Sequence, residues 1–221
     1  TYNFRTMGKG LANQKASQTD VTPMDITHSK VACTLGNWVA GEYTDIFDAA
    51  EVNFDERREL AQTIAGAMGR RADQLIVDAL SAGSTISHGS TGLTVAKITS
   101  AAKTLNDNGV PMDDRILLTS AAGIEDLLNE EKATSADYAT VRALMSGELN
   151  TFMGFNIVMM ETRAEGGLTL ASTTRDCFAF HKSSIGCAIG LDISTEVNYI
   201  PEKTSWLSLG KYKAGAVTID T

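Results

Sequence analysis

The sequence predicts an α+β fold that exposes more surface than a compact enzyme needs. Residues 21–47 have a strand-like pattern and precede any helix. Residues 55–83 then have the pattern of one long helix, and the chain from Gly154 onward is mostly β. Hydrophobic residues make up 43% of the 221 residues and charged residues 21%, which is typical of a folded globular chain and excludes a disordered one.

Residues 1–20 are expected to form an extended N-terminal arm. The first nineteen residues carry Arg5, Lys9 and Lys15 and no acid, whereas the whole chain has a net charge of −8. The acidic body argues against nucleic-acid binding, because phosphate contacts need clustered Lys and Arg. We expect the basic arm to lie on an acidic neighbouring subunit, and a nucleic-acid-binding tail is the alternative.

Residues 21–47 are expected to be mostly strand, ahead of any helix. Thr, Val, Ile and aromatic residues alternate with polar ones from position 21 to 47, and Gly36 and Gly41 interrupt the pattern. This pattern predicts strands. A hairpin with a flexible tip is the simplest arrangement for it.

A long helix is predicted to begin after Asp55 and to end at Gly83. Asp55 is a suitable N-cap, and Glu56 and Glu59 fall near the first turn, where the helix dipole favours acids. The apolar residues lie on one stripe: Leu60, Ile64, Met68, Leu75, Ile76, Ala79 and Leu80. At a rise of 1.5 Å per residue the helix spans roughly 38–40 Å. The helix and the loop that follows it occupy residues 55–92.

Residues 93–195 alternate short helices and strands, and residues 196–221 read as closing strands. Helices are predicted from Val95 to a stop at Gly109, after Ser120 as N-cap, and over 134–147. Strands are predicted at 116–118, 154–162 and 167–180, and a brief helix at 181–190. The closing stretch alternates in pieces, at Val197 and Tyr199, Leu207 and Leu209, and Val217 and Ile219.

No arrangement of reactive residues marks an active site. The sequence contains no GxSxG, no GxxxxGK[ST] and no HExxH, and His28, His88 and His181 form no local cluster. Cys33, Cys177 and Cys187 have no zinc or redox spacing, so reduced structural thiols are expected. We therefore assign no catalytic, cofactor-binding or metal-binding residue. No apolar run approaches the ~20 residues of a membrane span, so no membrane contact is expected.

The ordered series of these features resembles the major capsid proteins of tailed bacteriophages, which share the Hong Kong 97-like, or Johnson, fold. The stretch 26–80 resembles that family's extended loop running into its spine helix. The stretch 93–149 resembles its peripheral and axial helices with the first axial strand. TFMGFNIVMMET is similar to its frequent G-x-x-V/I step, and the segment 177–221 is similar to its usual ending. The resemblance covers essentially the whole chain.

The resemblance implies a division of the chain into five parts. These are an N-terminal arm (1–20), an extended loop (21–54), a peripheral domain with the spine helix and following loop (55–92), a mostly axial domain with peripheral segments (93–195), and closing peripheral strands (196–221). It also implies that the protein is not an enzyme. Hexamers and pentamers would build an icosahedral shell around double-stranded DNA, without sequence-specific DNA contacts.

The resemblance further implies that the extended loop lies over an adjacent subunit and that the arm reaches another. Trp38, Tyr43 and Phe47 would become buried on assembly, with Arg5 and Lys9 as arm contacts, and an intrachain aromatic core is the alternative. Lys30, the one lysine of the loop, lies near its base, so the covalent cross-linking of some family members is not carried over.

The implied location is the virion, after assembly in the host cytoplasm. The implied partners are other copies of the chain, a portal, and scaffolding or cement proteins. Two other interpretations stay open at this point. The closer one is an encapsulin-type nanocompartment shell protein, which shares the fold. The more distant one is a soluble α/β enzyme whose site is assembled from residues far apart in the sequence.

Overall fold

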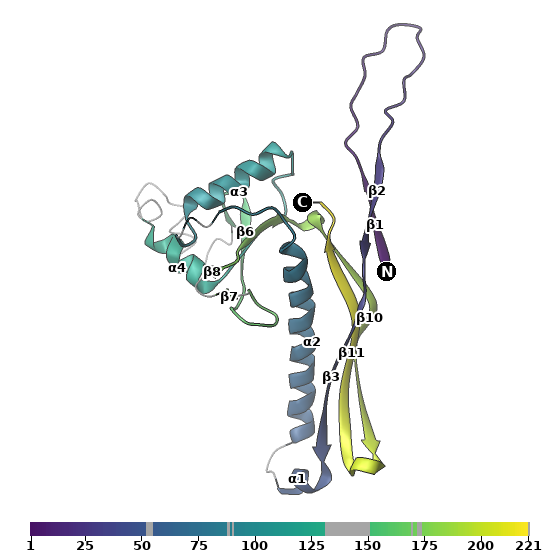
Figure 1. The fold of residues 1–221 in the computed structure, drawn as a ribbon, viewed down its shortest axis with the longest axis vertical. Helices are drawn as coiled ribbons and strands as arrows, with labels where there is room; N and C mark the ends of the chain where they lie inside the picture. Colours follow the sequence, from purple (N-terminus) through teal and green to yellow (C-terminus); the bar gives the residue numbers. More distant parts are fainter. Residues whose placement is uncertain are drawn as a thin grey trace.

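The computed structural model describes residues 1–51, 55–87, 89, 91–130, 151–168, 170–171 and 174–220, and it is elongated (Figure 1). A long helix and a long sheet run side by side, a lobe of helices and strands lies at one end of the helix, and a hairpin projects beyond the sheet. The strands are β1 (Tyr2–Met7), β2 (His28–Cys33), β3 (Gly36–Asp45), β4 (Arg115–Thr119), β5 (Thr151–Phe152), β6 (Phe155–Met159), β7 (Leu170–Ala171), β8 (Thr174–Arg175), β9 (Phe178–His181), β10 (Ile185–Ile200) and β11 (Ser205–Thr218). The helices are α1 (Ile46–Glu51), α2 (Glu56–Leu80), α3 (Val95–Asp107) and α4 (Ala121–Asn129), with 3-10 turns at Lys182–Ser184 and Pro201–Lys203.

Helix α2 confirms the predicted long helix and its start. The Asp55 side chain caps it by accepting a hydrogen bond from the Arg58 N–H, and Glu56 and Glu59 occupy the first turn. The α-helix ends at Leu80, and a turn leads to Gly83. Because a helix is stabilised by bonds between residues four apart, its limits are encoded locally and could be read from the sequence.

The sheet beside α2 has the antiparallel order β10-β11-β3. Met68 on the helix packs with Tyr212 and Ala214 on the central strand β11. At Gly210 a Cβ would stand 2.6 Å from the Ile64 Cγ2 atom. Glycine at this position of β11 therefore lets the helix approach the sheet closely, and the pair forms a stiff rod.

The α/β lobe is built on a four-stranded sheet with the order β5-β6-β4-β9, in which β4 is parallel to β6 and antiparallel to β9. Thr94 and Ser120 cap α3 and α4 with their side chains. The core of the lobe contains Ile98, Leu117, Leu127, Phe152 and Phe155. The predicted helices α3 and α4 and the predicted strands β4 and β6 are confirmed. The helix predicted at 134–147 lies outside the described residues.

The hairpin corrects the prediction for the first part of the chain. Strand β1 pairs antiparallel with β2, from Tyr2 opposite Cys33 to Met7 opposite His28. The expected arm therefore contributes the first strand of the hairpin, and the expected hairpin within 21–47 is wrong. Strand β3 instead pairs with β11, and Phe47 lies in helix α1. The partner of a strand is chosen by contacts far away in the sequence, which the local pattern does not contain.

The helix predicted at 181–190 is also wrong. Only Lys182–Ser184 forms a 3-10 turn, and strand β10 begins at Ile185. Thirteen positions of β10, beginning at Ile185 opposite Thr218, pair with β11. This long antiparallel ladder decides the conformation of a segment whose short apolar run fits either a helix or a strand.

Candidate subunit interfaces

The hairpin, residues 2–33, is fixed to the rod at its base by the apolar face of its strands. The ring of Phe4 lies over Gly186 of β10, where a Cβ would stand 2.7 Å from two ring carbons. Tyr2 meets Phe4 edge to face, with ring centroids 4.9 Å apart. Cys33 is buried against Gly215 of β11. Glycines in β10 and β11 thus make room for the hairpin base.

The opposite face of the hairpin is basic. Arg5 stands directly opposite Lys30 in the strand register, and both side chains are exposed. Like charges opposite each other in a sheet are destabilising unless a counter-charge is brought to them. The segment that joins the strands carries Lys9 and Lys15 together with Asp20 and Asp25, and it also exposes Leu11, Val21 and Met24. The strand face with Arg5 and Lys30 therefore suits an acidic partner, and the joining segment adds apolar contacts.

The far end of the rod, which we call the distal tip, exposes apolar side chains among acids. Phe47 is 71% exposed, and Tyr43 and Ile46 are 42% and 41% exposed. The ammonium group of Lys203 lies 3.8 Å from the centre of the Tyr43 ring. The acids of the distal tip are Glu42, Asp45, Asp48, Glu51, Asp55 and Glu202. Figure 1 shows α1 at this end and the hairpin at the other.

The residues expected at subunit contacts fall into two groups. Tyr43 and Phe47 lie at the exposed distal tip, and Arg5 is exposed on the hairpin. Trp38, by contrast, is half-buried and packs against the Met68 cluster of its own subunit, with the Arg71 guanidinium 3.5 Å from the ring centre. Trp38 thus makes the intrachain contacts of the alternative, and its contact with another subunit stays a prediction.

Lys9 also makes a contact within its own chain. Its ammonium group donates a hydrogen bond to the backbone carbonyl of Asn108, at a distance of 2.7 Å. Sequence reasoning did not find this partner, because nothing in the local pattern connects the hairpin with the end of α3.

Both outer edges of the rod sheet are unpaired within the part of the chain that the structure describes. Strands β10 and β3 are the edge strands, and β10 extends over 16 residues. Along β10 the side chains of Ile189, Val197 and Tyr199 are 59%, 51% and 42% exposed. Long exposed edges with apolar side chains are templates for pairing with another chain.

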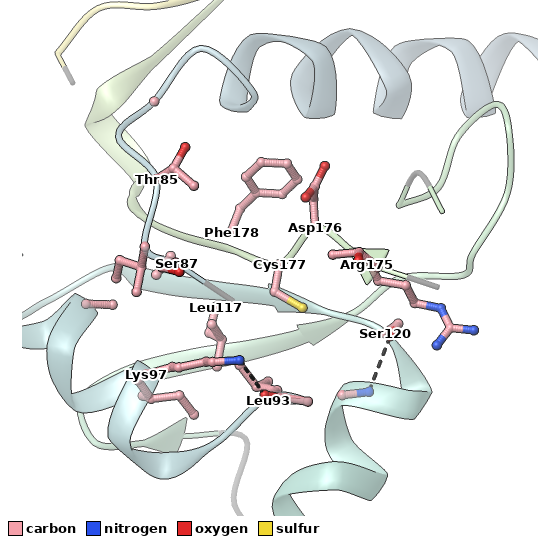
Figure 2. A pocket seen from close by; sticks show the side chains of 18 of the residues that line it. Thr85, Ser87, Leu93, Lys97, Leu117, Ser120, Arg175, Asp176, Cys177 and Phe178 are labelled. Carbon is pink, nitrogen blue, oxygen red and sulfur yellow. Dashed lines mark hydrogen bonds between the residues drawn. The ribbon is translucent and has the colours of Figure 1, made fainter. Parts of the chain in front are cut away.

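A cavity of about 930 Å³ lies in the α/β lobe between α3, α4, β4 and the segment before β9 (Figure 2). Its polar groups hold the surrounding backbone. The Lys97 ammonium donates to the carbonyls of Thr91 and Gly92, at 2.7 and 2.6 Å. The Ser120 hydroxyl accepts from the Gly123 N–H at 3.3 Å. The Cys177 sulfur lies 3.4 Å from the Thr119 hydroxyl. This arrangement supports the lobe and assembles no nucleophile with a base among the described residues.

Within the described ranges, no group of three or more His, Cys, Asp or Glu side chains could hold a metal ion. The three cysteines are free thiols, with Cys33 buried, Cys177 half-buried and Cys187 exposed. Burial raises the pKa of Cys33 above its ordinary value of 9.0, and the neighbouring Cys187 adds to the increase. None of the helices in the described part of the chain is long and apolar enough to cross a membrane.

An elongated subunit whose sheet edges are unpaired among the described residues, with a basic hairpin at one end and an acidic apolar tip at the other, is typical of a structural protein that assembles with copies of itself. Comparison with known proteins identifies the family of this structural protein. The whole chain, residues 1–221, matches the family model described as phage capsid protein, so the chain belongs to the phage capsid protein family. No curated protein matches the chain.

Solved phage structures have the same fold. A chain from Mycobacterium phage Che8 matches with a TM-score of 0.75 and 20% identity, over 99% of this chain and 81% of that one. The head structure of Helicobacter pylori bacteriophage KHP40 matches with a TM-score of 0.80 and 11% identity, over 98% and 78%. The capsid of Ralstonia phage GP4 matches with a TM-score of 0.68 and 11% identity, over 98% and 78%.

The resemblance to phage capsid proteins is confirmed. The function of the chain is to build the icosahedral shell of a phage particle, and the chain is a component of the virion. The mixed helix-and-strand fold matches those of phage capsids. The family match gives no support to the nanocompartment protein or the α/β enzyme.

Proposed function

We propose that the chain has the Hong Kong 97-like organisation and assembles as hexamers and pentamers around the double-stranded DNA of a tailed phage. The β1–β2 hairpin serves as the extended loop. Helix α2 and its sheet form the peripheral domain, and the lobe with α3, α4 and the four-stranded sheet forms the axial domain. The protein has no catalytic role and encloses DNA without reading its sequence.

We further propose that the hairpin of one subunit lies on the distal tip of the next. Arg5 and Lys30 face its acids, and the exposed Phe47 becomes a buried anchor. Opposite charges steer the two surfaces together, while a central aromatic side chain contributes most of the affinity. The free edge of β10 or β3 gains a strand partner in the same contact.

The observation that carries this proposal is the position of the two complementary surfaces at opposite ends of one elongated subunit (Figure 1). They cannot meet within one chain, so each finds its complement only on another copy. A head-to-tail contact between different surfaces closes into a ring when the rotation between copies allows it. Rings of six and five are the units of a closed shell.

Size-exclusion chromatography and negative-stain electron microscopy of the tag-free protein test the assembly itself. We expect closed shells or rings of five and six subunits, and nuclease-resistant DNA inside particles isolated from phage. A subunit that stays monomeric in the presence of its phage's scaffolding protein would contradict the proposal.

Charge reversal tests the contact between hairpin and distal tip. The double variant Arg5→Glu with Lys30→Glu should abolish assembly, and adding Asp48→Lys with Glu51→Lys should restore it. Lys103→Glu, which reverses an exposed charge on α3, is the matched control and should assemble normally. Phe47→Ser should weaken assembly far more than Val39→Ser, a change at a comparably exposed apolar residue (64% against 71%) in β3 and away from the distal tip. Normal assembly of the Arg5/Lys30 variant would rule out this contact.

We propose a portal as a further partner, with scaffolding or cement proteins, and assembly in the host cytoplasm. These proposals rest on the family and on the surfaces left free by the subunit. Co-purification of such proteins with assembly intermediates from infected cells checks them.

A further inference from the structure

We propose that Lys9 is a releasable latch, which holds the hairpin against α3 of its own subunit and lets go when the hairpin binds a neighbour. The release step rests on the proposed function, whereas the latch itself is a property of the single subunit. Lys9 lies just beyond β1, and its ammonium group donates to the Asn108 carbonyl across 99 residues of sequence. The same nitrogen is 3.1 Å from the position that a Cβ on Gly109 would take.

The C-terminal end of α3 favours a cation from elsewhere in the chain, because the last turn of the helix has no basic residue of its own. The last turn contains no basic residue and ends in Asp107, although the C-terminus of a helix carries a partial negative charge. The chain turns at Gly109, whose φ is +66°. There the N–H of Gly109 donates to Asn106 and that of Val110 to Leu105. This is a Schellman turn, and it leaves the Asn108 carbonyl to an outside donor.

Two cations share this helix end from opposite sides. Arg115 is buried and approaches from the sheet, donating to the Val110 carbonyl at 2.6 Å, the Asn106 side chain at 2.8 Å and the Pro111 carbonyl at 2.8 Å. Lys9 is exposed and approaches from solvent. The buried contacts of Arg115 are permanent parts of the lobe, whereas the exposed contact of Lys9 can open without uncovering a core.

The two attachments of the hairpin therefore differ in kind. At the base, Phe4 over Gly186 and the buried Cys33 are apolar contacts. At Lys9, a single charge meets a backbone dipole in water, which salt screens. A carboxylate on a neighbour's distal tip offers the ammonium group a full opposite charge. On assembly Lys9 thus exchanges the Asn108 carbonyl for a carboxylate, which binds the ammonium group more strongly, while the base of the hairpin keeps its apolar contacts.

Hydrogen exchange of the unassembled subunit tests the latch. Lys9→Met keeps the aliphatic stem and removes the charge, Lys9→Arg keeps the charge, and Lys15→Met is the matched control in the same segment. The reporters are the amide of Gly8, which donates to the Thr27 carbonyl at 2.9 Å, and those of the peptide 8–27. At low salt, the exchange rate of these amides in Lys9→Met should be roughly two- to fivefold higher than in the wild type. This is the size of effect expected for one exposed charge at a helix end. Lys9→Arg and Lys15→Met should match the wild type, and high salt should remove the difference.

Equal exchange in Lys9→Met and the wild type at low salt would overturn the latch, whether or not shells form. The same comparison in assembled shells tests the release, since there the two proteins should become indistinguishable over residues 8–27. A difference that persists in the shells would refute release. If the wild type forms no shells, the proposed function is contradicted instead, and electron microscopy detects this outcome separately.

Discussion

The side-chain oxygen of Gln74 accepts a hydrogen bond from the backbone N–H of Gly166 at 3.0 Å, and this contact ties the loop 160–168 to the C-terminal half of α2. Gln74 is buried, and its amide nitrogen donates to Asp78 at 2.7 Å. Gly166 has a φ of +72°, and a Cβ there would stand 2.7 Å from the Cα of Arg70. The loop ends in Leu168, which is fully buried. One polar side chain of α2 thus helps, together with the buried Leu168, to join the rod to the α/β lobe.

Replacing Gln74 by Met should release this loop. The change keeps the length of the side chain but leaves the Gly166 N–H without its acceptor. An unsatisfied buried group costs about 1–3 kcal/mol, and because Gly166 is half-buried the loss should lie at the lower end of that range. Urea unfolding should show the loss of stability, and hydrogen exchange should locate it at 160–168. Asp73→Ala alters the exposed neighbouring position and serves as the control. Unchanged exchange at Gly166 would show that the loop is held by other contacts.

Removing the ring of Phe4 should detach the base of the hairpin. Phe4 is half-buried, so Phe4→Ala should cost less than the roughly 3–5 kcal/mol of a fully buried phenylalanine. Hydrogen exchange should increase in β1 and β2 and stay constant in α3. Gly186→Ala should have a similar effect from the other side, because its Cβ would collide with the ring. Tyr2→Ala, at a more exposed ring, should have the smaller effect, and the reverse order would contradict this account.

Arg115→Met should destabilise the α/β lobe strongly. Three oxygen acceptors at the end of α3 lose their donor, two of them backbone carbonyls, and the sum should exceed about 3 kcal/mol. Thermal or urea unfolding measures it. Arg163→Met removes an exposed pair with Glu161 and should change stability by less than about 1 kcal/mol. Similar effects of the two changes would mean that the buried hydrogen bonds of Arg115 contribute little.

The cysteines should differ in reactivity and in their effect on stability at high pH. Because burial, and then the nearby Cys187, raise the pKa of Cys33, alkylation should modify Cys187 quickly and Cys33 only on unfolding. The raised pKa contributes stability below pH 9.0, the ordinary value, and the contribution is lost as the pH rises through the higher folded value. Burial also raises the pKa of Tyr212 above 10.0, so it acts in the same direction.

Urea unfolding between pH 8 and 11 measures this loss of stability. In Cys33→Ala the decline should be smaller than in the wild type, with the remainder due to Tyr212. Cys187→Ala removes only the second cause of the raised pKa values and leaves the burial of Cys33 and Tyr212 in place, so it should reduce the decline less than Cys33→Ala does. An equal decline in Cys33→Ala would contradict the role given to Cys33.

The sequence by itself determined the elements whose signals are local. Asp55, Thr94 and Ser120 begin the three main helices with side-chain caps, and Gly109 ends α3 with a positive φ. The ordered series of such elements was enough to point to the capsid family. Helices and caps can be read this way because their hydrogen bonds join residues only a few positions apart.

Only the tertiary structure decided which distant segments meet. It paired the first residues with β2 and β3 with β11. It also divided the expected helix at 181–190 between the end of β9, a 3-10 turn and the start of β10. It packed the half-buried Trp38 against the Met68 cluster of its own subunit and placed Lys9 at the end of α3. A strand edge or a long charged side chain accepts many partners, and burial over the whole chain selects among them. Packing of the rod and its hairpin therefore settled what the local pattern left open.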